Sequence, residues 1–581
     1  MSLPVVASTS AACLLMGYVL YGSLLSKLFR LDRNTKTPAL ELRDDLDYVP
    51  IAPRFLMSQH FSAIAAAGPI VGPILAGIMF GWLPALLWIV LGSIFIGGVH
   101  DFGVLVASVR HKARSITEVV REHMTRRSYL IFLCFVWIAI VYVIVAFTDI
   151  VANSFVGVQT LENGLTVSGG GIASSSLLYL ALPVVMGMLM HYAGLRLGLA
   201  TVIFLPLVGL AIWAGHYIPL DLAKILGVSD ATTVKIWDVL LLVYCCVASI
   251  VPMWSLLQPR GHLGGYLLFF ALAAGMLGIL FGGKGVEYPA FTGWSTAKGE
   301  PLAPLLFITI ACGACSGFHA LVASGTTSKQ LQYETDARPV GYGMMLMEGM
   351  VAVVSLCCVM MLSRGTAISL VGKPNLVYAQ GIGTFLEVIR VPVVFGVSFG
   401  LLAFTTFVYD TLDVCTRLGR YVLQELTGLH GTSGRWLATL VTAGVPLFLV
   451  MQTVLDPSGK AVPAWKVFWS LFGASNQLLA GLALVGVTVW LYQAYRANWV
   501  WFVTGLPLAV MYVMSTWMLL RFIRDGFFTE TWEFKGVPHD PVTWVSVVLV
   551  GLAGMLLVEA ALVLARVRAS PVPAAGRFGR S

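Results

Sequence analysis

The residues of this chain most able to do chemistry are acidic groups and histidines within long apolar runs. Glu348 stands in "MMLMEGMVAV" with no other charge nearby, and His319 stands in "SGFHALVASGTTSK". An ionisable group at membrane depth is costly, so it usually faces a cavity or a partner. A carboxyl group can carry a proton, and histidine titrates near physiological pH. We therefore interpret Glu348 as an ion-coupling residue, with His319 as a second member of that site.

Three aspartates in apolar runs are further ion-coupling candidates. The first follows a histidine, and the other two lie about one turn apart near the expected inner end of their helix. Each precedes an arginine at a helical spacing, so salt-bridged helix ends remain as open an interpretation as a coupling role or a gate. Glu348 could likewise be the structural partner of an arginine. The aspartates are Asp101, Asp410 and Asp413, and the candidate partners are Arg110, Arg338 and Arg417.

Two stretches rich in Gly, Ser, Thr and Pro occur where a membrane-spanning run should be apolar. Aligned on Phe61 and Phe318, they share the pattern F-x-A-[IL]-x-A-x-G. A helix broken by such residues exposes backbone groups that are tolerated in a membrane only where protein, water or a ligand completes their hydrogen bonds. Close helix packing through small residues, or a proline kink, is the alternative. The breaks are expected at Ala67 to Pro73, and at Ser316-Gly317 or Ser324 to Thr327.

A broken helix also predicts a binding site. Amides freed at the start of a half-helix suit an anion, whereas freed carbonyls suit a cation. We therefore expect a small anionic or zwitterionic substrate near mid-membrane, between the two breaks. For the side-chain amides of Asn476 and Gln477, and for His60, hydrogen bonding within the protein is the alternative role. The residues expected to bind substrate are Ser62, Gly68, Ser316, Gly317, His319, Ser324, Gly325, Thr326, Asn476 and Gln477.

The composition defines the elements that must position these groups. Of 581 residues, 58% are hydrophobic and 11% are charged, which is typical of a polytopic membrane protein rather than a soluble domain. About 15 apolar runs of roughly 20 residues predict an all-α bundle, because a β-barrel would show short alternating segments. We expect one transmembrane domain, 1–581, with a peripheral helix at 1–30, a first inverted repeat at 55–230, a second at 300–495 and peripheral helices at 496–581.

The distribution of basic residues predicts the orientation. The connection from Arg110 to Arg127 carries six Lys and Arg and should be cytoplasmic. The loop expected to hold Arg260 falls on the same side, as does the basic tail with Arg577 and Arg580. The N-terminus is then outside and the C-terminus inside, with the first helix retained rather than cleaved. These basic residues account for much of the net charge of +8, so no nucleic-acid partner is implied.

Two amphipathic stretches are expected along the inner membrane surface: "SITEVVREHM" from Ser115 and "GRYVLQELTGL" from Gly419. The nine cysteines nearly all fall within predicted spans, which gives no sign of an extracellular disulfide framework. Cys312-Gly-Ala-Cys315 lacks a second pair of ligands nearby, so we interpret these cysteines as small packing residues and expect no metal and no cofactor.

Several longer strings resemble the carbon starvation protein A family of bacterial peptide and pyruvate transporters, from Asp47 to about Leu520. The resemblance implies a bacterial inner-membrane importer of small carboxylates such as pyruvate, or of short peptides, driven by a cation gradient that is most often protons. It also implies inverted repeats and two broken helices, as in the leucine-transporter type of the amino acid, polyamine and organocation superfamily. The strings are "DYVP" from Asp47, "HFSAIAAAGPIVGP" from His60, "HDF" from His100, "ITIACGACSGFHALVASGTTSKQLQYETDARPVGYGMMLMEGMVAV" from Ile308, "DTLDVCTRLGRYVLQ" from Asp410 and "LFGASNQLLA" from Leu471.

The sequence leaves other functions open. A sodium-coupled amino acid or peptide carrier fits the same pattern, and so does a membrane sensor that binds a nutrient without moving it. An enzyme is disfavoured because no recognisable nucleophile, metal cluster or large active-site loop is present. ATP-driven transport is disfavoured because the chain contains no G-x-x-x-x-G-K-[ST] motif.

Overall fold

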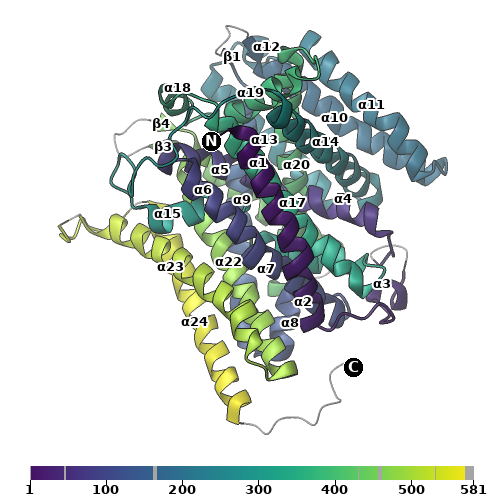
Figure 1. Cartoon of the computed structure of the whole chain (residues 1–581), viewed down its shortest axis with the longest axis vertical. Coiled ribbons are helices and arrows are strands. Elements are labelled where there is room, and N and C mark those ends of the chain that lie inside the picture. Colours follow the sequence, from purple (N-terminus) through teal and green to yellow (C-terminus); the bar gives the residue numbers. More distant parts are fainter. Residues whose placement is uncertain are drawn as a thin grey trace.

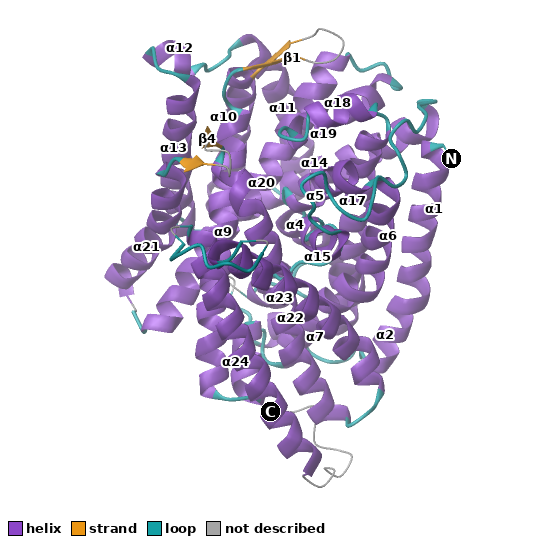
Figure 2. Ribbon diagram, turned by 90° about the vertical axis from the view of Figure 1, so that its left-hand side faces the viewer, coloured by secondary structure: helices purple, strands orange, loops and turns teal. Residues whose placement is uncertain are grey.

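The computed structural model describes residues 2–44, 48–160, 166–429, 431–455, 461–529, 531–538 and 540–569. Asp47, Arg577 and Arg580 lie outside these residues. The described chain forms a bundle of helices whose long axes run mostly along one direction (Figures 1 and 2). Two short antiparallel hairpins complete it: β1 (Val158–Thr160) with β2 (Thr166–Ser168), and β3 (Val454–Leu455) with β4 (Ala461–Val462).

The helices of the first half are α1 (Leu3–Met16), α2 (Gly22–Leu28), α3 (Pro38–Glu41), α4 (Pro53–Ile64), α5 (Gly68–Phe80), α6 (Trp82–Gly92), α7 (Gly98–Arg110), α8 (Ile116–His123), α9 (Arg126–Ser154), α10 (Gly169–Tyr192), α11 (Leu197–Tyr217), α12 (Leu222–Leu226), α13 (Asp230–Ile250) and α14 (Leu257–Phe281). The second half contains α15 (Leu302–Thr309), α16 (Phe318–Gly325), α17 (Met344–Met360), α18 (Arg364–Ser369), α19 (Pro374–Glu387), α20 (Val393–Thr427), α21 (Gly431–Met451), α22 (Ala464–Tyr495), α23 (Leu506–Phe527) and α24 (Pro541–Ala569). Turns of π-helix join α1 to α2, join α6 to α7, and precede α17 and α23.

The number of membrane spans is slightly lower than the sequence predicts. Thirteen helices of the described chain are long and apolar enough to cross a membrane, and one bent pair brings the number to 14. The run at 303–325 differs, because it divides into α15 and α16, each too short to cross alone. The all-α polytopic class is thereby confirmed, and the difference in number comes from the interrupted run.

The first helix break lies between α4 and α5, which meet at a bend of 49°. The predicted break, Ala67 to Pro73, overlaps the observed one only at Ala67 and is otherwise wrong. The helix is interrupted at Ala65 to Ala67 and then continues through Gly72 and Pro73. Gly72 serves close packing instead, since a Cβ atom there would overlap the carbonyl oxygen of Thr309. Gly68 has the same role toward the side chain of Cys312.

The second break is longer and separates α15 from α16. The chain leaves the helix at Ile310 and re-enters it at Phe318, so the predicted break at Ser316-Gly317 is confirmed. The alternative at Ser324 to Thr327 marks the other end of α16. Gly317 lies against the backbone of α22, where a Cβ atom would overlap Asn476 and Ala480.

The two broken helices run in opposite directions. The residue before α4 meets the segment after α16, because the Ile51 amide donates to the Gln330 carbonyl at 3.0 Å. The other end of the pair is closed in the same way, since the Leu83 amide after α5 donates to the Ala290 carbonyl before α15 at 2.9 Å. The start of each broken helix therefore lies beside the end of the other, as an inverted arrangement requires.

Three further expectations need correction. Arg260 lies within α14 and not in a loop, and it is buried. Helix α20 continues to Thr427, so "GRYVLQELTGL" is its last part and not a separate surface helix; the helix ends where Gly428 adopts a left-handed φ of 70°. Asp410 consequently lies at the middle of α20. Helix α19, in the connection before α20, is not among the predicted runs and packs against α20.

The first of the two amphipathic stretches does form a helix of its own. Helix α8 begins after Ser115, whose hydroxyl accepts a hydrogen bond from the Glu118 amide at 3.3 Å and so caps its first turn. Ile116, Val119 and Val120 form its buried face. In Figure 1, α8 lies at the lower end of the bundle, near α2.

The packing role of Gly72 gives a test of this fold. Gly72→Ala should lower the thermal stability of the purified protein in detergent, because the added methyl group meets the Thr309 carbonyl and costs about 1–3 kcal/mol. Gly444→Ala in α21 is the matched control, since no atom lies within 4 Å of its Cβ position. Equal melting temperatures for the two variants would contradict the close crossing of α5 with the second break.

Candidate functional site

Four buried titratable residues form what we call the acid–histidine cluster: His100 and Asp101 of α7, His319 of α16 and Glu348 of α17. Asp101 Oδ1 lies 2.7 Å from His100 Nδ1, and its Oδ2 lies 2.8 Å from His319 Nδ1. Nε2 of His319 lies 3.2 Å from Oε2 of Glu348, at an angle that does not make a hydrogen bond. All four side chains are fully buried. The structure therefore brings together Asp101, His319 and Glu348, three of the ion-coupling residues that the sequence predicts.

The hydrogen bonds of this cluster constrain its protons. An ionised carboxylate only accepts, so Asp101 receives Nδ1–H from both imidazoles. The remaining nitrogen of His319 then faces Glu348, and a single proton there can reside on either the imidazole or the carboxyl group. Within the described residues, neither oxygen of Glu348 has a hydrogen-bond partner. A buried acid without a hydrogen bond is an energetically costly arrangement that is characteristic of functional sites.

A second buried set, the arginine–aspartate cluster, lies between α14, α13 and α20. Arg260 Nε lies 2.5 Å from Asp410 Oδ1, and its Nη1 forms an ion pair with Asp413. The hydroxyl of Tyr244 donates to Asp413 at 2.8 Å, and that of Ser62 donates to Asp410. One cation thus balances two carboxylates inside the membrane-spanning bundle.

Helix α4 links the two clusters through its last turn. His60 and Ile64 are one turn apart and share a face of the helix. On this face His60 Nδ1 contacts Thr327 Oγ1 at 2.9 Å. The Ile64 carbonyl faces the imidazole of His319. Ser62 points to the other side, toward Asp410. A shift of this turn would therefore change the surroundings of both clusters.

The backbone of the second break is satisfied largely by α22. Asn476 Oδ1 accepts from the Phe318 amide at 2.9 Å, and its amide nitrogen donates to the Ser316 hydroxyl at 3.1 Å. The side chain of Gln477 donates to the Phe307 carbonyl at 2.5 Å, and the hydroxyl of Ser93 donates to a carbonyl of the unwound segment at 3.1 Å. Asn476 and Gln477 thus make the interhelical hydrogen bonds that the sequence left as one alternative.

The remaining predicted substrate residues lie elsewhere. Ser324 is at the far end of α16, about 12 Å along the axis from Ser316 at 1.5 Å per residue. Its hydroxyl donates to the Ala320 carbonyl at 2.6 Å and accepts from the Ile116 amide at 3.0 Å, which connects α16 to α8. Gly325 and Thr326 follow it at the same end. The structure therefore separates Ser324, Gly325 and Thr326 from the break.

The arginine partners proposed from helical spacing are wrong. Arg110 pairs with Glu334 at 2.7 Å rather than with Asp101. Arg417 donates to the carbonyls of Ala248 and Val251, at 2.7 and 2.6 Å, rather than to the aspartates of its own helix. Side chains one or two turns apart on the same helix can form ion pairs. Here Arg110 lies at the end of its helix and Arg417 contacts a neighbouring helix, so neither pairs with an aspartate of its own helix.

Arg338 is also not the partner of Glu348, because it donates to the Tyr18 carbonyl at 2.8 Å. The sequence did not indicate Arg260, which is the partner of Asp410 and Asp413. Its neighbourhood, "PRGHLGG", is typical of a loop. In the structure Pro259 occupies the first turn of α14, where its missing N–H costs little, and Gly264 packs against Ser62 and Asp410. A charged residue followed one turn later by close-packing glycines, Gly264 and Gly265, is the signal that could have indicated it.

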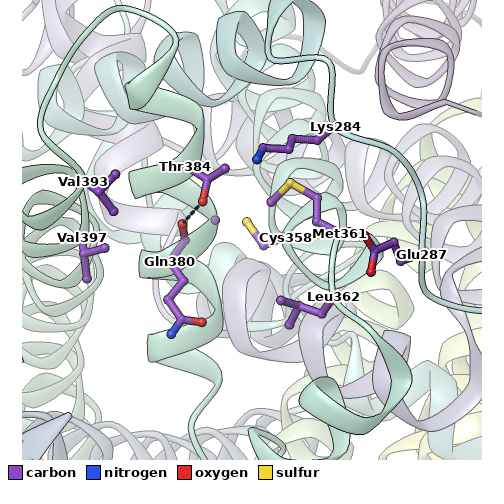
Figure 3. A pocket seen from close by; sticks show the side chains of 10 residues that line it. Lys284, Glu287, Cys358, Met361, Leu362, Gln380, Thr384, Val393 and Val397 are labelled. Atoms are coloured by element: carbon purple, nitrogen blue, oxygen red, sulfur yellow. Dashed lines mark hydrogen bonds between the residues drawn. The ribbon is translucent and has the colours of Figure 1, made fainter. Parts of the chain in front are cut away.

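A pocket of about 250 Å³ lies away from both clusters, at the ends of α14 and α17 and against α19 and α20 (Figure 3). Cys358, on its wall, lies about 15 Å along α17 from Glu348, at 1.5 Å per residue. None of the residues predicted from the sequence lines it. The lining residues are Lys284, Glu287, Cys358, Met361, Leu362, Gln380, Gly381, Thr384, Val393 and Val397.

A multi-span helical bundle with a broken helix and buried charges defines a polytopic membrane protein of the transporter class. The family model described as "Carbon starvation protein CstA" matches residues 2–376 and 365–518. The chain belongs to the CstA family and is a transporter, not an enzyme. It is 33% identical to the peptide transporter CstA of Campylobacter jejuni over 87% of this chain and 78% of that protein. It is 32% identical to the pyruvate/proton symporter BtsT of Escherichia coli over 91% and 84%, respectively.

Among solved structures, the chain aligns with the manganese transporter of Eremococcus coleocola. The TM-score is 0.46 and the identity 15%, over 91% of this chain and 99% of that one.

The arginine–aspartate cluster supports a stability prediction. Arg260→Gln should destabilise the protein by about 3–5 kcal/mol, because it leaves two carboxylates buried without their cation. Adding Asp410→Asn and Asp413→Asn should restore part of the loss. Thermal unfolding in detergent measures both effects. Arg524→Gln, which removes an exposed ion pair with Asp525, is the control and should cost no more than about 1 kcal/mol; an Arg260 variant as stable as this control would contradict the assignment.

Proposed function

We propose that the protein is a secondary active importer that couples proton movement to the uptake of a small carboxylate such as pyruvate, or of a short peptide. The observation that carries the proposal is the fully buried acid–histidine cluster, in which His319 of a broken helix lies 3.2 Å from Glu348, whose oxygens have no hydrogen-bond partner among the described residues. The E. coli relative named as a pyruvate/proton symporter supports both the cation and one of the two cargoes.

The proton balance explains how this cluster would couple. With Asp101 ionised and one proton shared between His319 and Glu348, the cluster carries one net negative charge. A second proton makes it neutral, because the imidazolium and a neutral Glu348 then coexist beside Asp101. Burying a neutral cluster is much less costly than burying a charged one, so protonation changes the relative free energies of conformations that differ in their exposure to water.

The substrate is expected beside this cluster. Helix α5 begins at the first break and α16 begins at the second, so the partially positive N-terminal ends of both helices lie at the same depth in the membrane. Gly68 allows α5 to approach Cys312 of the second break. An anionic carboxylate is the complementary ligand. The first amide of α16 is already bonded to Asn476, so the substrate would have to replace or extend this contact. Ser62, Gly68, Ser316, Gly317, His319, Asn476 and Gln477 remain the proposed substrate residues near this depth.

The mechanism we propose is alternating access by two inverted repeats, residues 55–230 and 300–495, of the leucine-transporter type. The antiparallel broken helices support it, because the start of each lies beside the end of the other. The last turn of α4 would transmit the change, since it contacts both clusters. The N-terminus would lie outside and the C-terminus inside the cytoplasmic membrane, by the distribution of Lys and Arg.

Reconstituted transport tests the proposal. Purified protein in liposomes should accumulate labelled pyruvate or a labelled dipeptide when an inward proton gradient is imposed. Glu348→Gln should reduce gradient-driven accumulation at least about tenfold, because the variant cannot gain or lose a proton there, while exchange of labelled for unlabelled substrate continues. Glu387→Gln, an exposed acid at the end of α19, is the matched control and should transport like wild type.

Three outcomes would contradict parts of the proposal. Accumulation driven by a sodium gradient and indifferent to protons would assign the coupling to sodium. Full proton-driven uptake by Glu348→Gln would move the coupling site away from the acid–histidine cluster. Saturable binding of both substrates with no accumulation under either gradient would indicate a sensor.

A further inference from the structure

Two histidines meet at the end of the bundle that carries α8, outside both buried clusters. His111 directly follows α7, and His123 is the last residue of α8. Their Nε2 atoms lie 2.7 Å apart, and their rings are nearly perpendicular with centroids 4.9 Å apart. Both side chains are half-buried, and the exposed carboxylate of Glu122 joins them in a group whose ligand atoms, one from each residue, all lie within 4.8 Å of one another.

The other nitrogen of each ring is already committed as a donor. His111 Nδ1 lies 2.6 Å from the Ala107 carbonyl, which can only accept. His123 Nδ1 lies 2.7 Å from Oε1 of Gln493 on α22. The amide nitrogen of Gln493 donates to the His123 carbonyl at 3.0 Å, which fixes the orientation of this side chain. Both imidazoles therefore carry hydrogen on Nδ1.

Two neutral rings in this state would turn their Nε2 lone pairs toward each other. Such a contact is repulsive unless a cation lies between the nitrogens, and that cation is either a proton or a metal ion. Neutral imidazole is the metal-binding form.

We propose that His111, His123 and Glu122 bind a divalent transition metal such as Zn²⁺. Two imidazole nitrogens and a carboxylate are typical protein ligands of this ion, with a fourth position left for water. Zn–N distances near 2.0–2.1 Å in a tetrahedral site require the Nε2 atoms to separate to about 3.3 Å, a small movement of two half-buried rings. The Ala107 carbonyl and Gln493 are the outer hydrogen bonds that hold metal-binding histidines in the required tautomer.

The nearby charges set a competition for the carboxylate. Arg114 lies 3.6 Å from Glu122 and 3.8 Å from Glu118, so metal binding must draw Glu122 away from the guanidinium. The bound metal would tie the end of α7 to α8. Gln493 connects the same site to α22, and the first amide of α8 is bonded to Ser324 of the second broken helix.

Calorimetric titration of the full-length protein with Zn²⁺, in detergent and without a polyhistidine tag, tests the site. We expect one saturable ion per chain, and with Co²⁺ the visible absorption of a tetrahedral complex. His111→Asn and His123→Asn should each weaken binding at least about 100-fold. Gln493→Leu, which keeps all three ligands, should weaken it about 10–100-fold through the lost outer hydrogen bond.

Two further variants separate the ligands from the surroundings. Glu122→Gln should weaken binding, whereas Arg114→Gln should tighten it, because the carboxylate is then free. His216→Asn, an exposed histidine at the end of α11, is the control and should bind like wild type. The proposal would be overturned if Zn²⁺ did not bind saturably, or if wild type, His111→Asn and His123→Asn bound it with equal affinity. Loss of structure in a single variant would not produce the opposite changes in affinity that we expect for Glu122→Gln and Arg114→Gln.

Discussion

The architecture depends on one constraint: a helix broken inside a membrane must complete its backbone hydrogen bonds within the protein. The chain meets it with side chains from neighbouring helices. Asn476 and Gln477 of α22 and Ser93 between α6 and α7 bond to the backbone or side chains around the second break. The close approach that these bonds need is possible because Gly72 and Gly317 carry no Cβ atom where the segments cross. The small and polar residues of both stretches are thus explained first by packing and hydrogen bonding.

The two buried clusters solve the cost of charge in different ways. In the arginine–aspartate cluster, Arg260 is bonded to both carboxylates, and Ser62 and Tyr244 add further hydrogen bonds. The acid–histidine cluster instead leaves both oxygens of Glu348 without a hydrogen bond among the described residues. The first arrangement stabilises a fixed geometry, whereas the second can change its protonation. For this reason we assign a mainly structural role to the arginine–aspartate cluster and propose ion coupling for the acid–histidine cluster.

The sequence predicted some features well for identifiable reasons. Glu348 and His319 could be singled out because an isolated ionisable residue in an apolar run has few explanations, and their proximity follows from the fold. The helical spans followed from hydropathy. Partners across helices could not be predicted, because spacing along one helix says nothing about its neighbours: Arg260 pairs with Asp410 from a different helix. The position of the first break was missed because glycine marks both breaks and close contacts, and only the structure distinguishes them.

Helix α16 joins the centre of the bundle to the end that carries α8. Its first turn is bonded to Asn476, its His319 belongs to the acid–histidine cluster, and its Ser324 accepts the first amide of α8. A helix of eight residues is too short to bend gradually, so a displacement at His319 must move Ser324 as well. Any conformational change that begins with protonation of the cluster would therefore reach α8, and contacts that hold α8 to α7 and α22 would oppose it. In this arrangement the acid–histidine cluster and the α8 end of the bundle are mechanically connected, although about 12 Å of helix separates the two ends of α16.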